Sequence, residues 1–369
     1  MKTVGQWVEQ HQVTSFVAIT GALAFAISLP GIFMFATEQP ANHIVQGSFL
    51  RFFFVFAKDW PANYIIQYCF VRVLIFSPAL AGLIVTRITA KQEPHGSIWM
   101  RATAFLVSWV LAVAVTFLFI SHTGTSWTII PYPSTSLTII NTALGALFPA
   151  FIISAAFSRR PDTRRFLSTL VKPRGRYYWY LAALFAFPVF SALGSAVTRS
   201  FAENPSSPVG DLSSDAVSRT VATFLYALFF TGGFGQEAGW RGFALPRLQA
   251  RYCPLVACLV IWFLHMIWEL PGDVVFSDNP WPAMGRLVWM PCWSVLLVWI
   301  YNRTDGSILA PTLLHASISA TTSLNAALLH TDAATVLLFG LAGFAVVNDR
   351  MWKSLPASSL AVQGIARTP

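Results

Sequence analysis

The sequence contains few charged residues. Only 11% of its 369 residues are Asp, Glu, Lys or Arg, and 55% are hydrophobic. Soluble globular domains carry about 25% charged residues. The mean hydropathy of +0.60 is also atypical of a soluble fold. These values exclude a water-soluble globular protein and indicate an integral membrane protein.

Cysteines are scarce, and the signals of a secreted protein are missing. Four cysteines lie in or beside apolar segments and form no C-x-x-C pair. We therefore expect neither a disulfide framework nor a thiolate metal site. Residues 1–12 lack the apolar core and small-residue cleavage site of a signal peptide, so the first apolar segment is interpreted as a retained anchor.

Long apolar runs occupy most of the chain. A helical span needs about 20 mostly apolar residues. Continuous runs of this length favour helices over the short alternating strands of a barrel. The sequence therefore predicts an all-α, polytopic membrane bundle of about eight to ten transmembrane helices. The approximate spans are 14–35, 63–87, 99–121, 136–157, 177–198, 216–234, 253–272, 283–301, 307–329 and 334–349.

The net charge of +9 follows the predicted topology. Basic residues gather in the loops after even-numbered spans, above all in the loop 158–176. The positive-inside rule then places both termini in the cytoplasm. We expect membrane lipids, including anionic headgroups, as partners and no nucleic acid. The short loops and the lack of a retention signal favour a bacterial cytoplasmic membrane. The sequence does not predict an oligomeric state.

The polar motifs are confined to one part of the chain. We divide it into an N-terminal transmembrane scaffold (1–210), a membrane core (211–333), and a last helix with a cytoplasmic tail (334–369). Glycines at 232, 233 and 235 precede the first polar motif without the Lys-Ser/Thr of a phosphate loop. We interpret them as positions where helices approach closely or where a span breaks. Arg72, in the second span, is expected to reach the interface or to pair internally.

Three pairs of polar side chains stand four residues apart in consecutive apolar regions. They are Glu237 with Arg241, His265 with Glu269, and His315 with Ser319. Residues four apart share one face of a helix. Each pair alone is compatible with a structural contact between helices. Together they predict one small wet cavity, because ionisable groups inside a membrane are costly and mark functional sites.

Such a cavity suits hydrolysis. A carboxylate accepts a proton from water, and imidazoles bind a metal or stabilise an oxyanion. A relay for ions or protons is the alternative use of the same groups.

The motifs resemble the CPBP intramembrane proteases, which include the CAAX prenyl proteases and the bacterial Abi-type proteins. Residues 236–249 read QEAGWRGFALPRLQ, similar to the family's E-E-x-x-x-R motif and its W-R-G-F-A-L-P-x-L-Q extension. Residues 265–271 occupy the place of the F-x-x-x-H motif, and residues 315–319 that of H-x-x-x-N. The resemblance covers about 100 residues. It implies hydrolysis of a membrane-associated polypeptide.

Four motif positions differ from the family pattern. Gln236 replaces the glutamate taken to activate water, and an amide cannot accept that proton. In the second motif Glu269 replaces the histidine, while His265 stands at the aromatic position one turn earlier. Ser319 replaces the asparagine of the third motif. Glu237, Arg241 and His315 are unchanged.

These departures leave three hypotheses open. The first is a rearranged endopeptidase with Glu237 or Glu269 as base, and with Gln236 orienting water or peptide. Its remaining catalytic candidates are Arg241, His315 and Ser319, and its candidate zinc ligands are His265, Glu269 and His315. The second is an inactive family member that acts as a membrane binding or immunity protein. The third is a transporter-like ion or proton relay.

Overall fold

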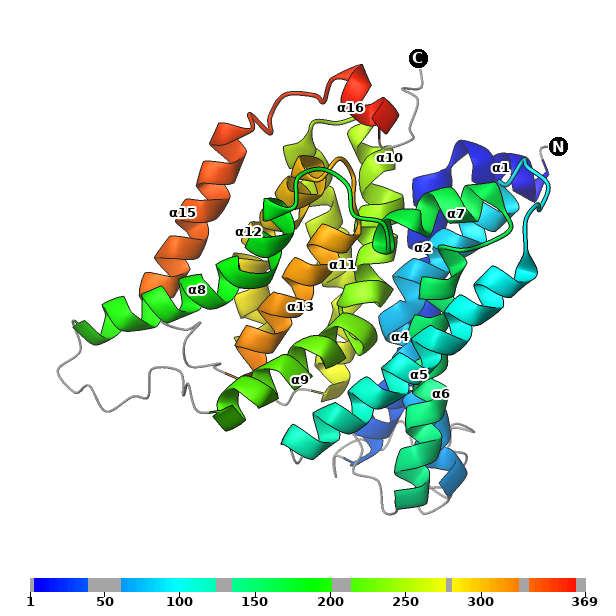
Figure 1. Cartoon of the computed structure of the whole chain (residues 1–369), viewed down its shortest axis with the longest axis horizontal. Coiled ribbons are helices and arrows are strands. Elements are labelled where there is room, and N and C mark those ends of the chain that lie inside the picture. The colour runs from blue at the N-terminus through cyan, green and yellow to red at the C-terminus, as the bar shows by residue number, and fades with distance from the viewer. Residues whose placement is uncertain are drawn as a thin grey trace.

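The protein is helical throughout its described part. The computed structural model describes residues 3–38, 61–123, 135–200, 214–276, 281–324 and 332–362, which contain no β-strand. The all-α prediction is therefore confirmed for these residues. In Figure 1 the long helices form one bundle, and the first and last helices, α1 (Val4–Gln10) and α16 (Ala357–Val362), lie at the same end of it.

The long helices follow the predicted spans closely, and shorter helices lie between them. The N-terminal half contains α2 (Gln12–Glu38), α4 (Pro61–Ile88), α5 (Ile98–Thr123), α6 (Thr135–Ala155), α7 (Pro161–Leu167), η2 (Ser168–Leu170) and α8 (Tyr178–Ser200). The C-terminal half contains α9 (Ser214–Phe230), η3 (Gly233–Ala244), α10 (Leu245–Gln249), α11 (Pro254–Phe276), α12 (Trp281–Arg303), α13 (Leu309–Leu324) and α15 (Asp332–Asn348).

Three described stretches are long and apolar enough to cross a membrane: Val71–Ile88, Ile98–Thr123 and Thr135–Ala155. Other apolar stretches are shorter, at 10–17 residues, including Tyr178–Gly194 and Pro254–Leu270. These helices fit an integral membrane protein. The predicted number of eight to ten membrane crossings, the orientation of the termini and the division into three segments remain predictions.

One predicted span has a different boundary. The sequence indicated a helix over 216–234, with the first polar motif at its mouth. In the structure α9 ends at Phe230, and a second helix, η3, begins at Gly233 and contains the whole motif. The motif is buried, because Glu237 has an exposed fraction of 0%. The glycines that follow Phe230 interrupt α9, and the chain then continues as the π-helix η3.

Close approach between η3 and α4 places the motif in the bundle. A Cβ atom at Gly239 would lie 2.3 Å from the carbonyl carbon of Pro78 in α4. One at Gly235 would lie 3.1 Å from the carbonyl oxygen of Ile75. Gly235 and Gly239 form a G-x-x-x-G pair, a pattern that lets membrane helices pack with backbones nearly touching. Among the glycines at 232, 233 and 235 that the sequence indicated as contact or break positions, close contact between helices is confirmed at Gly235.

Pro78 also reorganises the hydrogen bonds of α4. Proline lacks an N–H, so the carbonyl four residues earlier, at Leu74, loses its helical donor. The Ser77 hydroxyl donates to that carbonyl at 2.8 Å and accepts from the Trp268 indole N–H at 2.8 Å. The serine therefore satisfies the freed carbonyl and joins α4 to α11.

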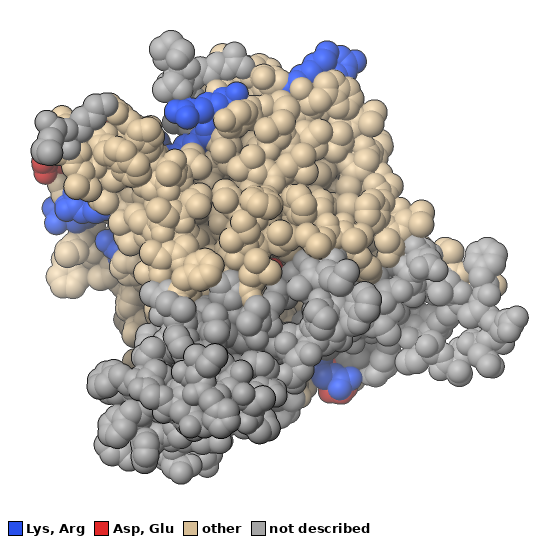
Figure 2. Space-filling view, turned by 180° about the vertical axis from the view of Figure 1, so that it is seen from behind, with Lys and Arg blue, Asp and Glu red and all other residues tan. Residues whose placement is uncertain are grey.

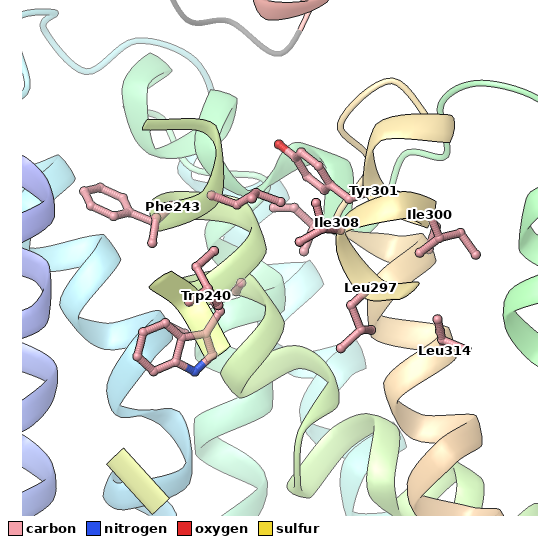
Figure 3. Packing of buried hydrophobic residues seen from close by; sticks show 14 of the residues in the cluster. Trp240, Phe243, Leu297, Ile300, Tyr301, Ile308 and Leu314 are labelled. Atoms are coloured by element: carbon pink, nitrogen blue, oxygen red, sulfur yellow. The ribbon is translucent and has the colours of Figure 1, made fainter. Parts of the chain in front are cut away.

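Aromatic packing fixes the other face of η3. Phe16 of α2 stacks on Phe243 with ring centroids 5.2 Å apart and meets Trp240 edge-on at 5.4 Å. Figure 3 shows Trp240 and Phe243 pointing from η3 away from α12, which contributes Leu297 and Ile300 to the same core. The predicted N-terminal scaffold and membrane core thus share one apolar interior.

Charged side chains are sparse on the described surface around the middle of the molecule. On the face shown in Figure 2, the described Lys and Arg residues gather mainly towards one end, the end at which α1 and α16 lie. A broad surface without described charges lies below them. This distribution fits a protein whose apolar belt faces lipid.

The contact at Gly239 predicts a stability effect. We expect Gly239→Ala to destabilise the protein by about 1–3 kcal/mol, because an added methyl group would overlap rigid backbone atoms. Gly340→Ala in α15 is the matched control, since nothing lies within 4 Å of a Cβ there. Thermal unfolding in detergent compares the two variants, and equal midpoints would contradict the close approach.

Candidate active site

The first motif lies on a π-helix. Backbone N–H groups of Glu237 and Leu245 bond to carbonyls five residues earlier, at Gly232 (3.3 Å) and Trp240. Such helices are rare and frequently occur at functional sites. Four glycines at 233, 235, 239 and 242 supply the small surface that this wider helix needs to pack closely. The sequence predicted the helical pairing of Glu237 with Arg241 but not the helix type.

Glu237 joins the unchanged motif residues. Its Oε1 accepts from Arg241 Nη1 at 3.0 Å and from His315 Nδ1 at 2.7 Å. Arg241 and Glu237 are 1% and 0% exposed. A buried charge requires a partner, and this carboxylate neutralises the guanidinium while fixing the imidazole of α13. Glu237 therefore links two motifs that lie 78 residues apart.

The changed residues form a second cluster. His265 Nε2 lies 3.1 Å from Gln236 Oε1 and 3.4 Å from Glu269 Oε1. Both neighbours are acceptor oxygens, so Nε2 carries the proton. The His265 ring stacks on Trp240 with centroids 5.3 Å apart and an interplanar angle of 22°. Gln236 and Glu269 thus both contact His265, and these are three of the four positions that depart from the family pattern.

Both clusters border one cavity of about 470 Å³. Arg241, His265, Glu269, His315 and Ser319 line its wall. Gln236 and Glu237 lie behind this wall and act on it through their partners. The prediction that the three polar pairs converge on a cavity is therefore confirmed. Glu269 presents the more accessible carboxylate, because its side chain is 23% exposed against 0% for Glu237.

Sequence reasoning missed further polar side chains of the cavity, among them Ser294. Ser294 of α12 is 3% exposed and lines the wall. Its hydroxyl accepts from Arg241 Nη2 at 3.4 Å and donates to the Cys258 carbonyl at 3.3 Å. The available signal was a lone hydroxyl in the apolar run 287–301, which alone does not distinguish a site residue from a helix contact.

Arg72 supports the site from outside the cavity. Its guanidinium donates to the Phe230 carbonyl at 2.8 Å and to the Tyr226 hydroxyl at 2.6 Å. The Phe230 carbonyl belongs to the last turn of α9, where helical carbonyls lack backbone donors. Arg72 therefore caps α9 just before the break that leads to η3. The prediction of internal pairing is confirmed. Of the other histidines, His122 is half-buried, and His330 lies outside the described residues.

The predicted zinc ligands are not assembled as a set. Within the described ranges, no three His, Cys, Asp or Glu side chains form a group that could hold a metal ion. His265 is bonded to Gln236 and Glu269, whereas His315 is bonded to Glu237. Each imidazole thus has a different partner, and the arrangement does not fit a site formed by His265, Glu269 and His315.

Comparison with known proteins identifies the segment that contains both clusters. Residues 218–321 match the family model of the type II CAAX prenyl endopeptidases, Rce1-like. The match assigns this segment to the CPBP/CAAX protease family. A search of curated proteins found no match to the chain. The CAAX-protease segment runs from α9 to α13 and includes the cavity-lining residues of η3, α11, α12 and α13. The resemblance inferred from the motifs is confirmed.

Gly232 provides the space for His315. A Cβ at Gly232 would lie 1.9 Å from His315 Nε2, although the backbone there (φ −74°, ψ −28°) suits alanine. We expect Gly232→Ala to push the ring away from Glu237 and to destabilise the protein. In a His315→Ala background, Gly232→Ala should lower the free energy of unfolding by less than it does in the parent. The difference between the two losses is the coupling free energy, which we expect to be about 0.5–3 kcal/mol. Unfolding measurements on the four forms give this coupling, and strictly additive effects would contradict the contact.

Proposed function

We propose that the protein is an intramembrane endopeptidase that hydrolyses a membrane-associated polypeptide. One observation carries the proposal: a carboxylate, two imidazoles and a guanidinium meet at one cavity within the CAAX-protease segment. These groups can activate water and stabilise the charge that develops on a peptide carbonyl. The family match lends no support to the transport or binding alternatives.

Glu269 is the better candidate for the general base. Its carboxylate borders the cavity and is partly exposed, so water and substrate can reach it. Glu237 is fully buried, and its Oε1 is already shared by Arg241 and His315. We therefore assign Glu237 to the positioning of those two side chains and Glu269 to proton transfer.

The proposed reaction uses this chain's residues alone. The Glu269 carboxylate takes a proton from water, and the water oxygen forms a bond to the scissile carbonyl carbon. The resulting oxyanion is stabilised by the Arg241 guanidinium and the His315 imidazole. The C–N bond then breaks, and the proton held by Glu269 passes to the leaving nitrogen.

The remaining polar residues orient these groups. His265 donates to both Gln236 and Glu269, and its stacking on Trp240 restricts the ring. Gln236 therefore acts as a positioning residue, in keeping with an amide that cannot remove a proton from water. Ser319 lines the wall one turn beyond His315 and is a candidate for contact with substrate.

The assignment of Glu269 predicts a loss of turnover. We expect Glu269→Gln to reduce cleavage by about 10²–10⁴-fold, because the amide removes the base and keeps the shape. The assay uses purified protein in liposomes with membrane-anchored peptides that carry or lack a prenylated cysteine. Glu93→Gln, at an exposed glutamate, is the matched control. Unchanged turnover in folded Glu269→Gln would contradict this role.

The Gln236→Glu variant separates a rearranged site from a lost one. If Glu269 is the base, the parent cleaves peptide and Gln236→Glu changes the rate without being required for activity. Turnover that appears only in Gln236→Glu would mean that the parent has lost hydrolysis. Absence of cleavage in both, with every probe peptide, would favour a binding protein.

The separation of the histidines predicts the response to metal removal. We expect the purified protein to contain less than stoichiometric zinc, and we expect a chelator to leave turnover unchanged. The reason is that His265 and His315 are bonded to different partners. Elemental analysis and cleavage after dialysis against chelator measure both quantities. Stoichiometric zinc with chelator-sensitive turnover would instead support the ligand set His265, Glu269 and His315.

A further inference from the structure

A second polar cavity lies beyond the end of η3, apart from the candidate active site. Its volume is about 260 Å³, and its wall includes side chains of α7, α10 and α12. Arg241 borders the active-site cavity, whereas the next residue, Gly242, borders this one. We call it the basic cavity, because Arg165, Arg174 and Arg247 line it against the single carboxylate of Asp162. The formal charge of this lining is 3 − 1 = +2.

The guanidinium of Arg247 is held in place beside the cavity. Its Nε donates to Gln12 Oε1 at 2.7 Å, and its Nη1 donates to the Phe243 carbonyl at 2.8 Å. The plane of the group lies over the Phe243 ring, 3.6 Å from the centroid. Nη2 has no hydrogen bond to another described residue. A fixed guanidinium with a spare donor is suited to binding an oxyanion, because little side-chain freedom is lost on binding.

Tyr301 contributes a hydroxyl that has no partner among the described protein groups and opens onto the basic cavity. The residue is 2% exposed and lines the basic cavity, and its hydroxyl has no hydrogen bond to any described residue. Figure 3 shows the oxygen pointing away from the packed side chains Leu297 and Ile300. Arg174 and Arg247 both interact electrostatically with this group. Because no described protein group occupies it, the Tyr301 hydroxyl is available to donate a hydrogen bond to a group bound in the cavity.

We propose that the basic cavity binds a phosphate monoester group. Arginine and tyrosine donors directed at one space match the several acceptor oxygens of a phosphate, and guanidinium groups pair with phosphate through two parallel bonds. Asp162 is the one opposing charge of the lining, and the three arginines leave the net charge of the cavity positive. The phosphate can belong to a lipid headgroup, since basic pockets among membrane helices bind such groups, or to a soluble phosphate ester.

The test measures binding directly on the purified full-length chain. Inorganic phosphate and a short-chain phosphatidic acid are added in separate arms, and diacylglycerol with the same chains is the control without phosphate. Thermal unfolding at matched ionic strength and native mass spectrometry report binding. We expect phosphatidic acid, inorganic phosphate or both to bind, while diacylglycerol does not. Binding of phosphatidic acid alone identifies a lipid headgroup as the source, whereas equal binding in both arms identifies a soluble phosphate.

Two variants locate the binding site. Tyr301→Phe removes only the unpaired hydroxyl and should weaken binding about tenfold, the effect of one lost hydrogen bond to a charged group. Tyr252→Phe, at an exposed tyrosine outside the cavity, is its control. Arg165→Gln should also weaken binding, whereas Arg164→Gln, one residue earlier and outside the lining, should not.

Two results would overturn the proposal. One is that neither phosphate probe binds the parent protein. The other is that binding is unchanged in both Tyr301→Phe and Arg165→Gln. If Tyr301→Phe fails to fold, the comparison of Arg165→Gln with Arg164→Gln decides. Because the readout is binding, it is independent of peptide cleavage.

Discussion

The buried carboxylate of Glu237 is the interaction on which the site depends. It neutralises Arg241 within η3 and holds His315 of α13 at 2.7 Å. Removing one member of a buried ion pair costs about 3–5 kcal/mol, because the other charge stays buried without a partner. The same contact fixes η3 relative to α13, and both elements contribute side chains to the wall of the cavity. The stability of the bundle and the geometry of the site therefore both depend on the hydrogen bonds that Glu237 Oε1 accepts.

The geometry around Glu237 follows from the glycines of η3. Gly239 lets the helix touch the Pro78 backbone of α4, and Gly232 leaves room for the His315 ring. A larger residue at either position would move η3 or the imidazole by more than the roughly 0.5 Å that a catalytic arrangement tolerates. In a membrane, where lipid tails are as apolar as the side chains, such close packing is a main source of helix association.

Much of this arrangement was predictable from sequence patterns. Apolar length defined nearly every long helix, and the spacing of four residues identified the pairs that border the cavity. Pattern could not predict the π-helix, because its register depends on how η3 packs against α4. It could not predict Ser294 either, since one hydroxyl in an apolar run is ambiguous. Pattern also could not predict the partners of the candidate zinc ligands, because the sequence places His265 and His315 near one cavity but does not say which acceptor each ring contacts.

The grouping of the motif residues explains how an altered motif can retain a function. The unchanged residues Arg241 and His315 both contact Glu237, and the replacements Gln236 and Glu269 both contact His265. A single replacement within a family site would leave a buried polar group without its partner, at a cost of about 1–3 kcal/mol. Here the histidine that is absent at 269 is supplied from 265, and its ring reaches both new oxygens. The second cluster is therefore satisfied internally, while its carboxylate stays open to the cavity. Compared with the family motif, the imidazole stands one turn earlier in α11, and a carboxylate stands in its former place. A proton acceptor therefore remains beside the guanidinium and the imidazole that Glu237 holds.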